Sequence, residues 1–472
     1  MDESYVRLIS ADISNFKNVR HGHLDFESKD PERASVLGLY GQNGSGKTTL
    51  IDALQVLKYA LQGGRIPEQY AEYINVGADT AKFSFTFQVS AGAAVSAVYY
   101  DFSLEAADDN DASNMEEAGR SEAKQRIRIF NEKLCIAHKS DSWTMRKSVF
   151  ADTDTDHILL PANKFAALFG HDKEIQHNLL IAKALTLATS RSFLFSREFL
   201  EAVRAKKKRA SEHKDLQLFT RILYRLVQYG HFDLHIINQR DAGIISVNIL
   251  PLSFRYTKEK RQAGGKIPLT LDKPSAVPER EYRVIETVLS NMNIVLQQIV
   301  PGLTIRMKNL GPTVLKNGEN GYMVALMSKK NSREIPLLYE SEGIKKIISI
   351  LQLLIVVYNH ESITVAIDEL DSGIFEYLLG ELLHIIAERG KGQLIFTSHN
   401  LRPLETLDKD FIAFTTTNPD KRYVRMNHVK TNNNLRSFYY RDIVVGGQKE
   451  ELYSPTHNAE IAFAFREAGA AL

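Results

Sequence analysis

Apolar and polar residues alternate in short runs near the start of the chain, a pattern typical of β-strands with one buried face. The first two runs, 6–9 and 21–26, predict a pair of antiparallel strands. Similar runs at 81–89, 97–104 and 127–130 predict three further strands. The first third of the chain is therefore expected to be rich in strands.

The period of the apolar residues changes in the middle of the chain. From Ile158 to Tyr229 the period is mostly helical. One apolar face of this region is formed by Phe219, Ile222, Leu223, Leu226 and Val227. Strand-like alternation returns at 234–254, glycines and prolines from Gly264 to Pro278 predict a flexible connection, and 279–300 is expected to be an amphipathic helix. An acidic stretch, Asp108 to Glu117, predicts an exposed loop.

The strongest chemical signal is the run Gly41 to Thr48, which matches the P-loop pattern G-x-x-x-x-G-K-[ST] at every fixed position. An apolar run at 36–40 predicts a buried strand before it, and 49–54 reads as the opening of a helix. This strand–loop–helix setting favours a phosphate site over an ordinary glycine-rich turn. The sequence therefore predicts binding of a nucleoside triphosphate.

Glycines in such a loop let backbone N–H groups surround phosphates, and the positive end of the following helix faces the same anion. Lys47 would reach the β- and γ-phosphates, and the hydroxyl of Thr48 would bind Mg²⁺. The residues expected to contact the nucleotide are Gly41, Asn43, Gly44, Ser45, Gly46, Lys47, Thr48 and Thr49.

A second apolar run, Ile363 to Ile367, ends in two carboxylates, Asp368 and Glu369, as a Walker B strand does. In a buried parallel strand Asp368 would lie at the carboxyl edge, beside the Mg²⁺ bound by Thr48. Glu369 would then orient or deprotonate the attacking water. A surface cap at the end of an ordinary strand is the alternative, and the pairing with a P-loop argues against it.

A third apolar run, Gln393 to Thr397, is followed by Ser398, His399 and Asn400. The imidazole of His399 would hydrogen-bond the γ-phosphate and the water. A lone histidine after a strand is more often structural, but its position one strand after the two carboxylates favours a catalytic role.

Composition limits the class of protein. With 472 residues, 44% apolar and 25% charged, the chain is long enough for two connected lobes. A net charge of +2 implies no overall attraction to nucleic acid. The single cysteine, Cys135, excludes an internal disulfide framework and fits a reducing compartment. The first residues lack an apolar signal segment, and the run from Ile347 to Tyr358 is too short to span a bilayer. We therefore expect a cytoplasmic protein without a membrane partner.

The order of P-loop, Walker B strand with adjacent glutamate, and Thr-Ser-His-Asn resembles the ATP-binding-cassette (ABC) ATPases of the SMC/RecF/OLD group, over roughly 5–150 and 335–430. Asp371 matches the D-loop aspartate of these proteins. Glu340 to Gly343 is similar to a shortened signature motif ahead of an apolar helix. The Q-loop glutamine has no clear match, and Gln88 is a weak candidate.

In this family the signature serine and glycine contact the γ-phosphate held by the P-loop of another subunit. The resemblance therefore implies that Ser341 and Gly343 act in trans, in at least a dimer with ATP at its interface. The alternative for Ser341 is a plain helix cap.

The resemblance implies an α/β fold: an ABC-type P-loop ATPase head with a mixed sheet, a compact α+β insert or lid, and no long coiled coil. We expect residues 1–152 to form the first part of the ATPase lobe, 153–334 the insert, and 335–472 the second part. The implied activity is slow, regulatory hydrolysis of ATP with Mg²⁺.

Two functions are compatible with such an ATPase. The short insert and layout resemble ATPase components of bacterial anti-phage systems, particularly the ATPase subunits of PARIS systems. That resemblance implies an oligomeric scaffold that holds an effector such as a TOPRIM nuclease and releases it when a phage-encoded trigger is present. The alternative is a RecF- or SMC-like ATPase of DNA repair or tethering, with DNA bound at the basic run Arg204 to Arg209.

Nearby acidic residues dilute this basic run and no aromatic residues interrupt it, so a solvated helix face is preferred. An OLD-type nuclease is disfavoured because the segment after His399 is short for a TOPRIM domain and has no acidic cluster with metal-site spacing.

Overall fold

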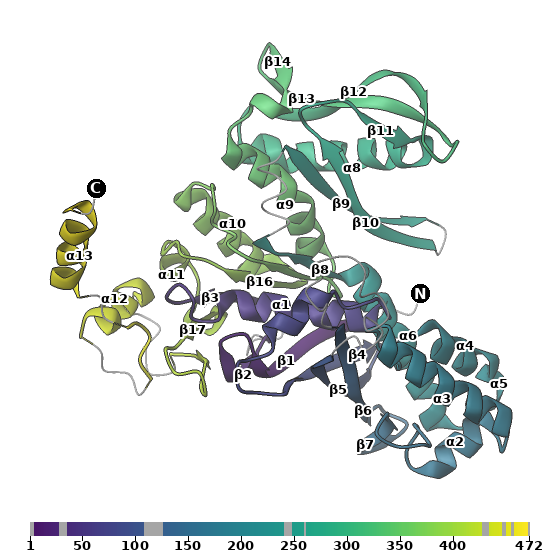
Figure 1. Ribbon diagram of the computed structural model, residues 1–472. Coiled ribbons are helices and arrows are strands. Elements are labelled where there is room, and N and C mark those ends of the chain that lie inside the picture. Colours follow the sequence, from purple (N-terminus) through teal and green to yellow (C-terminus); the bar gives the residue numbers. More distant parts are fainter. Residues whose placement is uncertain are drawn as a thin grey trace, which may run out of the picture.

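The fold is taken from a computed structural model of the chain (Figure 1). The structure describes residues 4–27, 35–107, 126–239, 248–258, 261–426, 434–445, 450–454 and 457–470. The predicted loop from Asp108 to Glu117 lies outside these residues. Within them, no helix has the length and apolar character needed to cross a bilayer.

A central six-stranded sheet forms the middle of the molecule. Its order is β18 (Tyr423–Val424), β17 (Ile412–Thr415), β3 (Ser35–Tyr40), β16 (Gln393–Thr397), β15 (Thr364–Ile367) and β8 (Leu234–Ile237). All neighbours are parallel except β18 and β17. Strands buried on both faces read as continuous apolar runs, which is why β3, β15 and β16 were recognisable in the sequence. Their carboxyl ends meet at one edge of the sheet.

The two faces of the central sheet contribute to two different cores. Leu37 and Leu39 of β3 pack with α1 (Lys47–Leu61), in one core. Val36 and Tyr40 point the other way, into a core with α9 (Glu342–Asn359) and α10 (Glu376–Arg389). Because side chains alternate along a strand, a single short strand joins both halves of the protein.

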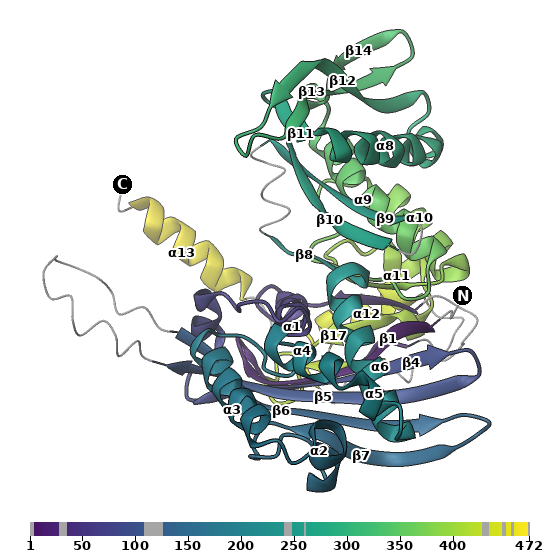
Figure 2. The ribbon, with the colours of Figure 1, turned by 90° about the vertical axis from the view of Figure 1, so that its right-hand side faces the viewer.

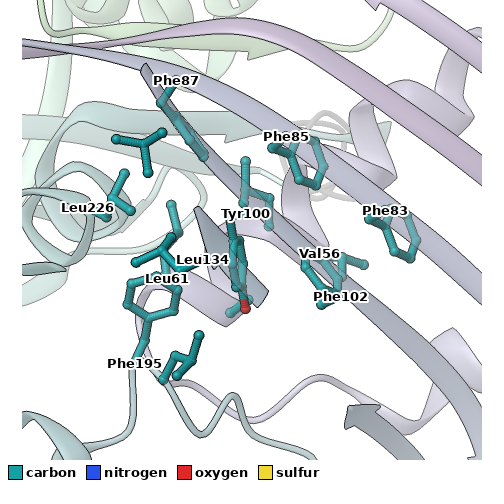
Figure 3. Close-up of a cluster of buried hydrophobic side chains, with 14 of the residues drawn as sticks. Val56, Leu61, Phe83, Phe85, Phe87, Tyr100, Phe102, Leu134, Phe195 and Leu226 are labelled. Carbon is teal, nitrogen blue, oxygen red and sulfur yellow. The ribbon is translucent and has the colours of Figure 1, made fainter. Parts of the chain in front are cut away.

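A second, antiparallel six-stranded sheet packs on the α1 side. Its order is β2 (Val19–Asp25), β1 (Ser4–Phe16), β4 (Thr80–Ala91), β5 (Ala94–Ala107), β6 (Arg126–Lys139) and β7 (Thr144–Asp152). The predicted pair 6–9 and 21–26 is confirmed as antiparallel β1 and β2, and the other predicted strands are confirmed in β4, β5 and β6. Phe83, Phe85 and Phe87 lie at every second position of β4 and are buried, and Figure 3 shows them near Val56 and Leu61 of α1.

The predicted helical region is confirmed and covers one end of this sheet (Figure 2). It comprises α2 (Ala162–Phe169), α3 (Lys173–Ala188), α4 (Arg197–Ala205), α5 (Lys207–Ala210) and α6 (Lys214–Gln228), followed by a short π-helix (Tyr229–Asp233). Glu132 of β6 anchors the segment before α4. Its buried carboxylate accepts hydrogen bonds from the hydroxyl of Tyr100 at 2.7 Å and from the backbone N–H of Phe193 at 2.6 Å.

A smaller α+β unit lies at the top of Figure 1. It contains β9 (Ile249–Lys258), β10 (Arg261–Thr270), β11 (Ser275–Pro278), α8 (Glu279–Ile299), β12 (Leu303–Val314), β13 (Asn320–Lys330) and β14 (Arg333–Pro336). α8 confirms the predicted amphipathic helix. The predicted flexible connection from Gly264 to Pro278 is wrong, because Gly264 pairs with Arg255 and Pro268 with Pro251 in the β9–β10 ladder. That ladder has only two strands, so both are edge strands, where proline is tolerated.

The last part of the chain contains the helices α11 (Pro403–Thr406), α12 (Leu435–Val445) and α13 (Asn458–Ala470). Short 3₁₀ turns lie at Glu68–Tyr73, Leu337–Tyr339 and Lys409–Phe411. The α/β class with a mixed sheet and a compact α+β insert is confirmed, and α8, with 21 residues, is the longest helix among the described residues. The three domain ranges stay a prediction. β8 lies in the range 153–334 yet pairs with β15 of the central sheet.

Candidate active site

A cavity of about 420 Å³ opens at the carboxyl edge of the central sheet, where the β3–α1 loop meets the ends of β15 and β16. It is lined by Lys17, Asn18, Asn43, Gly44, Gly46, Lys47, Thr48, Thr49, Gln239, Asp368, Glu369, Thr397 and His399. The structure thus brings together most of the predicted phosphate loop, both predicted carboxylates and the predicted histidine. Outside this lining lie Gly41, Ser45, Ser341, Gly343 and Asp371.

The loop conformation depends on glycine at the start of α1. Gly46 is the N-cap residue and has a left-handed backbone, with φ of 100°. Residues with a Cβ rarely adopt this conformation, so glycine lets the loop turn directly into the helix. The N-terminal N–H groups and the positive helix dipole end then face the cavity, which suits an anion. Ser45 supports the loop from behind, since its hydroxyl donates to the carbonyl oxygen of Gln42 at 2.5 Å.

Residues distant in sequence hold the loop from its other side. The side-chain amide of Asn18, in the β1–β2 turn, donates to the carbonyl oxygen of Gly44, and its oxygen accepts from the Thr49 hydroxyl at 3.1 Å. The Tyr423 hydroxyl of β18 donates to the carbonyl oxygen of Gly46 at 2.9 Å. Sequence reasoning missed these supports, because only the folded sheets bring the three segments together.

Lys47 is folded back onto its own loop. Its ammonium group donates to the carbonyl oxygens of Gly41 at 2.8 Å and Gln42 at 3.0 Å. Burial lowers the pKa of Lys47, while the carboxylates of Asp368, Glu369 and Asp371 act in the opposite direction. A phosphate oxygen would offer this cation a stronger, charge-assisted partner than either carbonyl.

Asp368 fits a magnesium site. Its side chain is almost wholly buried, with 1% exposed. One carboxylate oxygen accepts a hydrogen bond from the Thr397 hydroxyl at 2.5 Å, and the other has no partner among the described residues. Leaving a buried charged oxygen unpartnered is costly, and a cation removes that cost. Thr48 lines the same cavity, and Mg²⁺ commonly takes few protein ligands besides phosphates and water.

Glu369 lies at a strained turn just beyond β15. Its φ is 49°, which is rare for a residue other than glycine and is concentrated at functional sites. The Thr397 hydroxyl accepts its backbone N–H at 2.8 Å, so one threonine holds both carboxylate residues in place. The Glu369 carboxylate accepts from the side-chain amide of Gln239 at 3.0 Å.

Gln239 is the glutamine that sequence reasoning missed. It follows β8, the neighbour of β15, and lines the cavity. Gln88, named in the sequence analysis only as a weak candidate for the Q-loop glutamine, lies on β4 of the other sheet, bonds Ser90 and does not line the cavity. The available sequence signal was the short apolar run at 234–237, which predicts a buried strand ending just before Gln239.

Asp371 and His399 are linked through the backbone. The Asp371 carboxylate accepts from the N–H groups of His399 at 3.1 Å and Asn400 at 2.9 Å. Asp371 therefore fixes the loop that presents His399 to the cavity without lining the cavity itself.

Ser341 and Gly343 lie at the start of α9. The Ser341 hydroxyl accepts from the N–H of Ile344 at 3.3 Å, as an N-cap does, and the residue is exposed. A Cβ on Gly343 would lie 2.3 Å from the carbonyl oxygen of Gly373, so glycine is needed for this close approach. The first turn of α9 thus packs against the segment that follows Asp371. Whether the two residues act in trans stays a prediction.

Comparison with known proteins agrees with this geometry. The chain matches the AAA ATPase domain family over residues 7–402 and belongs to that family. It is 36% identical over 96 residues to the DNA replication and repair protein RecF of Chlorobaculum parvum, a match that covers 20% of this chain and 24% of RecF. The protein is therefore an ATPase with a P-loop that uses ATP with Mg²⁺.

Solved structures show more distant similarity. The Smc head domain bound to the C-terminal domain of ScpA, from Pyrococcus furiosus, is 13% identical with a TM-score of 0.37, covering 89% of this chain and 96% of that one. The Smc head domain with a coiled coil and joint from Pyrococcus yayanosii is 10% identical with a TM-score of 0.40, covering 93% and 100%.

Replacing Lys47 with alanine tests the phosphate loop. We expect Lys47→Ala to lower the rate of ATP hydrolysis by about 100-fold or more, because the cation nearest the phosphates is lost. Turnover is measured by phosphate release and ATP binding by calorimetry, with a melting curve to verify folding. Unchanged turnover together with unchanged ATP affinity would contradict the assignment.

Proposed function

We propose that the protein is an ATP-gated clamp that works as a dimer or a higher oligomer. Each copy would supply Ser341 and Gly343 to the nucleotide bound in the cavity of another copy. The observation that carries this proposal is the composition of the cavity: it has the phosphate loop, Asp368, Glu369 and His399, but neither signature residue.

The surface around Ser341 supports docking of a second copy. Tyr339 directly precedes the signature motif, and Phe375 follows the D-loop. Both side chains are exposed, Phe375 by 71%. The Tyr377 ring is half-exposed and lies 5.2 Å from the Arg402 guanidinium. Exposed aromatic side chains are typical of protein interfaces. ATP held between two such faces would favour the closed state, and hydrolysis would favour opening.

We further propose that the clamp holds a separate effector, such as a TOPRIM nuclease, and releases it on meeting a phage-encoded trigger protein. The resemblance to ATPase subunits of PARIS anti-phage systems favours this role. The exposed helix α13 supports it, because Ile461, Phe463 and Phe465 all lie in solvent, Phe465 by 76%. Figure 1 shows α13 standing apart from the ATPase body.

The variant Glu369→Gln tests the clamp. It keeps the size of the side chain but removes the carboxylate proposed to activate water, so hydrolysis should fall by about 100-fold while ATP still binds. The closed dimer should then persist in Mg-ATP, as measured by sedimentation velocity. A variant that turns over ATP at the wild-type rate, or stays monomeric with ATP bound, would contradict the proposal.

Affinity capture from the native host tests the effector. We expect tagged Glu369→Gln protein in Mg-ATP to retain a nuclease that Lys47→Ala protein does not retain, because only the former keeps the closed state. Retention of the same proteins by both variants, or of no protein by either, would contradict ATP-gated holding.

DNA is the second candidate partner. A groove of about 440 Å³ between α4 and α6 is lined by three basic residues of the helical segment, Arg204, Lys207 and Arg221. Cations gathered in one groove would neutralise phosphates and release counterions. Steeply salt-dependent DNA binding that is lost when these three residues are replaced by alanine would favour the repair or tethering function over the effector-holding one.

A further inference from the structure

Lys346 is a buried lysine without a partner. It lies on α9, three residues after Gly343, and is only 6% exposed. Its ammonium group has no hydrogen-bond partner among the described residues. Lysine at this depth is normally paired, since an isolated buried charge is costly. The neighbouring Lys345 shows the usual arrangement, with its ammonium group 2.5 Å from the Glu342 carboxylate.

The position of Lys346 places it behind the active site. The first turn of α9 touches the segment after Asp371 through Gly343 and Gly373, and the helix packs on β15, whose last residue directly precedes Asp368. Burial lowers the pKa of Lys346, and the carboxylates of Glu369, Asp371 and Asp368 oppose that shift. The charge of Lys346 therefore interacts with the same three carboxylates as Lys47.

These carboxylates also have unused hydrogen-bonding capacity. One oxygen of Asp368 and one of Asp371 are buried without a partner among the described residues. Lys47 is held by carbonyl groups of the phosphate loop and lines the cavity, whereas Lys346 does not line it. When bound phosphates attract Lys47, Lys346 would be the cationic side chain left to balance the negative charge of these carboxylates.

We propose that Lys346 is a positioning residue of the ATPase site, whose charge balances the Walker B and D-loop carboxylates and couples the signature helix α9 to Glu369. A partner copy docking at Ser341 would act on the helix that carries this charge. Movement of α9 would then change the electrostatic support of the carboxylates, which links assembly to hydrolysis. The proposal rests on the roles given above to Glu369 and Asp371.

The test compares two neighbouring lysines of α9. Lys346→Met removes the unpartnered charge and keeps an unbranched side chain, and Lys345→Met is the matched control with its charge paired to Glu342. We expect Lys346→Met to lower kcat by about tenfold or more, with the Kd for ATP within about twofold of wild type, because positioning and not binding is lost. Lys345→Met should keep both values, and Lys346→Arg should recover much of the kcat.

The proposal would be overturned by wild-type kcat in Lys346→Met, by equal losses of kcat in both methionine variants, or by no recovery of kcat in Lys346→Arg. A loss of kcat that only follows a lowered melting temperature and a smaller folded fraction would mark a structural role, and would overturn it as well. Glu369→Gln, assayed in parallel, separates the premise from the inference. If that variant is fully active, the carboxylate assignment fails; if it is inactive while Lys346→Met is normal, only the lysine proposal fails.

Discussion

The parallel pairing of β15 with β16 is the constraint on which the active site depends. This register sets Ile367 opposite Phe396. The next residues, Asp368 and Thr397, are then close enough for the threonine hydroxyl to bond the carboxylate. The same hydroxyl accepts the Glu369 N–H and so stabilises the left-handed turn there. A single side chain from the adjacent strand thus holds both Asp368, proposed to bind the metal, and Glu369, proposed to activate water.

Charge organises the site around this pair of strands. Lys47 of the phosphate loop and Lys346 of α9 both have a pKa lowered by burial, and in both the carboxylates of Asp368, Glu369 and Asp371 oppose that shift. Neither lysine has a carboxylate hydrogen bond within the described residues, so the cluster is held by longer-range attraction that a nucleotide can redistribute. Such an arrangement suits a switch, because binding of the nucleotide phosphates would draw Lys47 away and leave Lys346 to balance the charge of the carboxylates. It also gives the signature helix an electrostatic connection to the chemistry.

Local patterns carried most of the correct predictions. The phosphate loop, the Walker B strand and the strand before His399 are each formed by consecutive residues, so a local sequence pattern is enough to recognise them. Gln239 and Asn18, which line the cavity, and Tyr423, which supports the phosphate loop, were missed because only the folded chain brings them to residues far away in sequence. The glycine–proline segment around Gly264 was misassigned because a two-stranded ladder tolerates residues that usually break strands. Lys346 carried no signal, since its lack of a partner is a property of packing alone.

In the proposed clamp, the catalytic unit contains two copies, each completing the other's site. An equimolar mixture of Lys47→Ala and Ser341→Arg proteins tests it most directly. Ser341 lies outside its own cavity, so each variant keeps the half-site that the other has lost. Each variant alone should be inactive, and the mixture should regain ATP hydrolysis from mixed dimers with one intact composite site. A mixture no more active than the two separate variants would contradict a shared site.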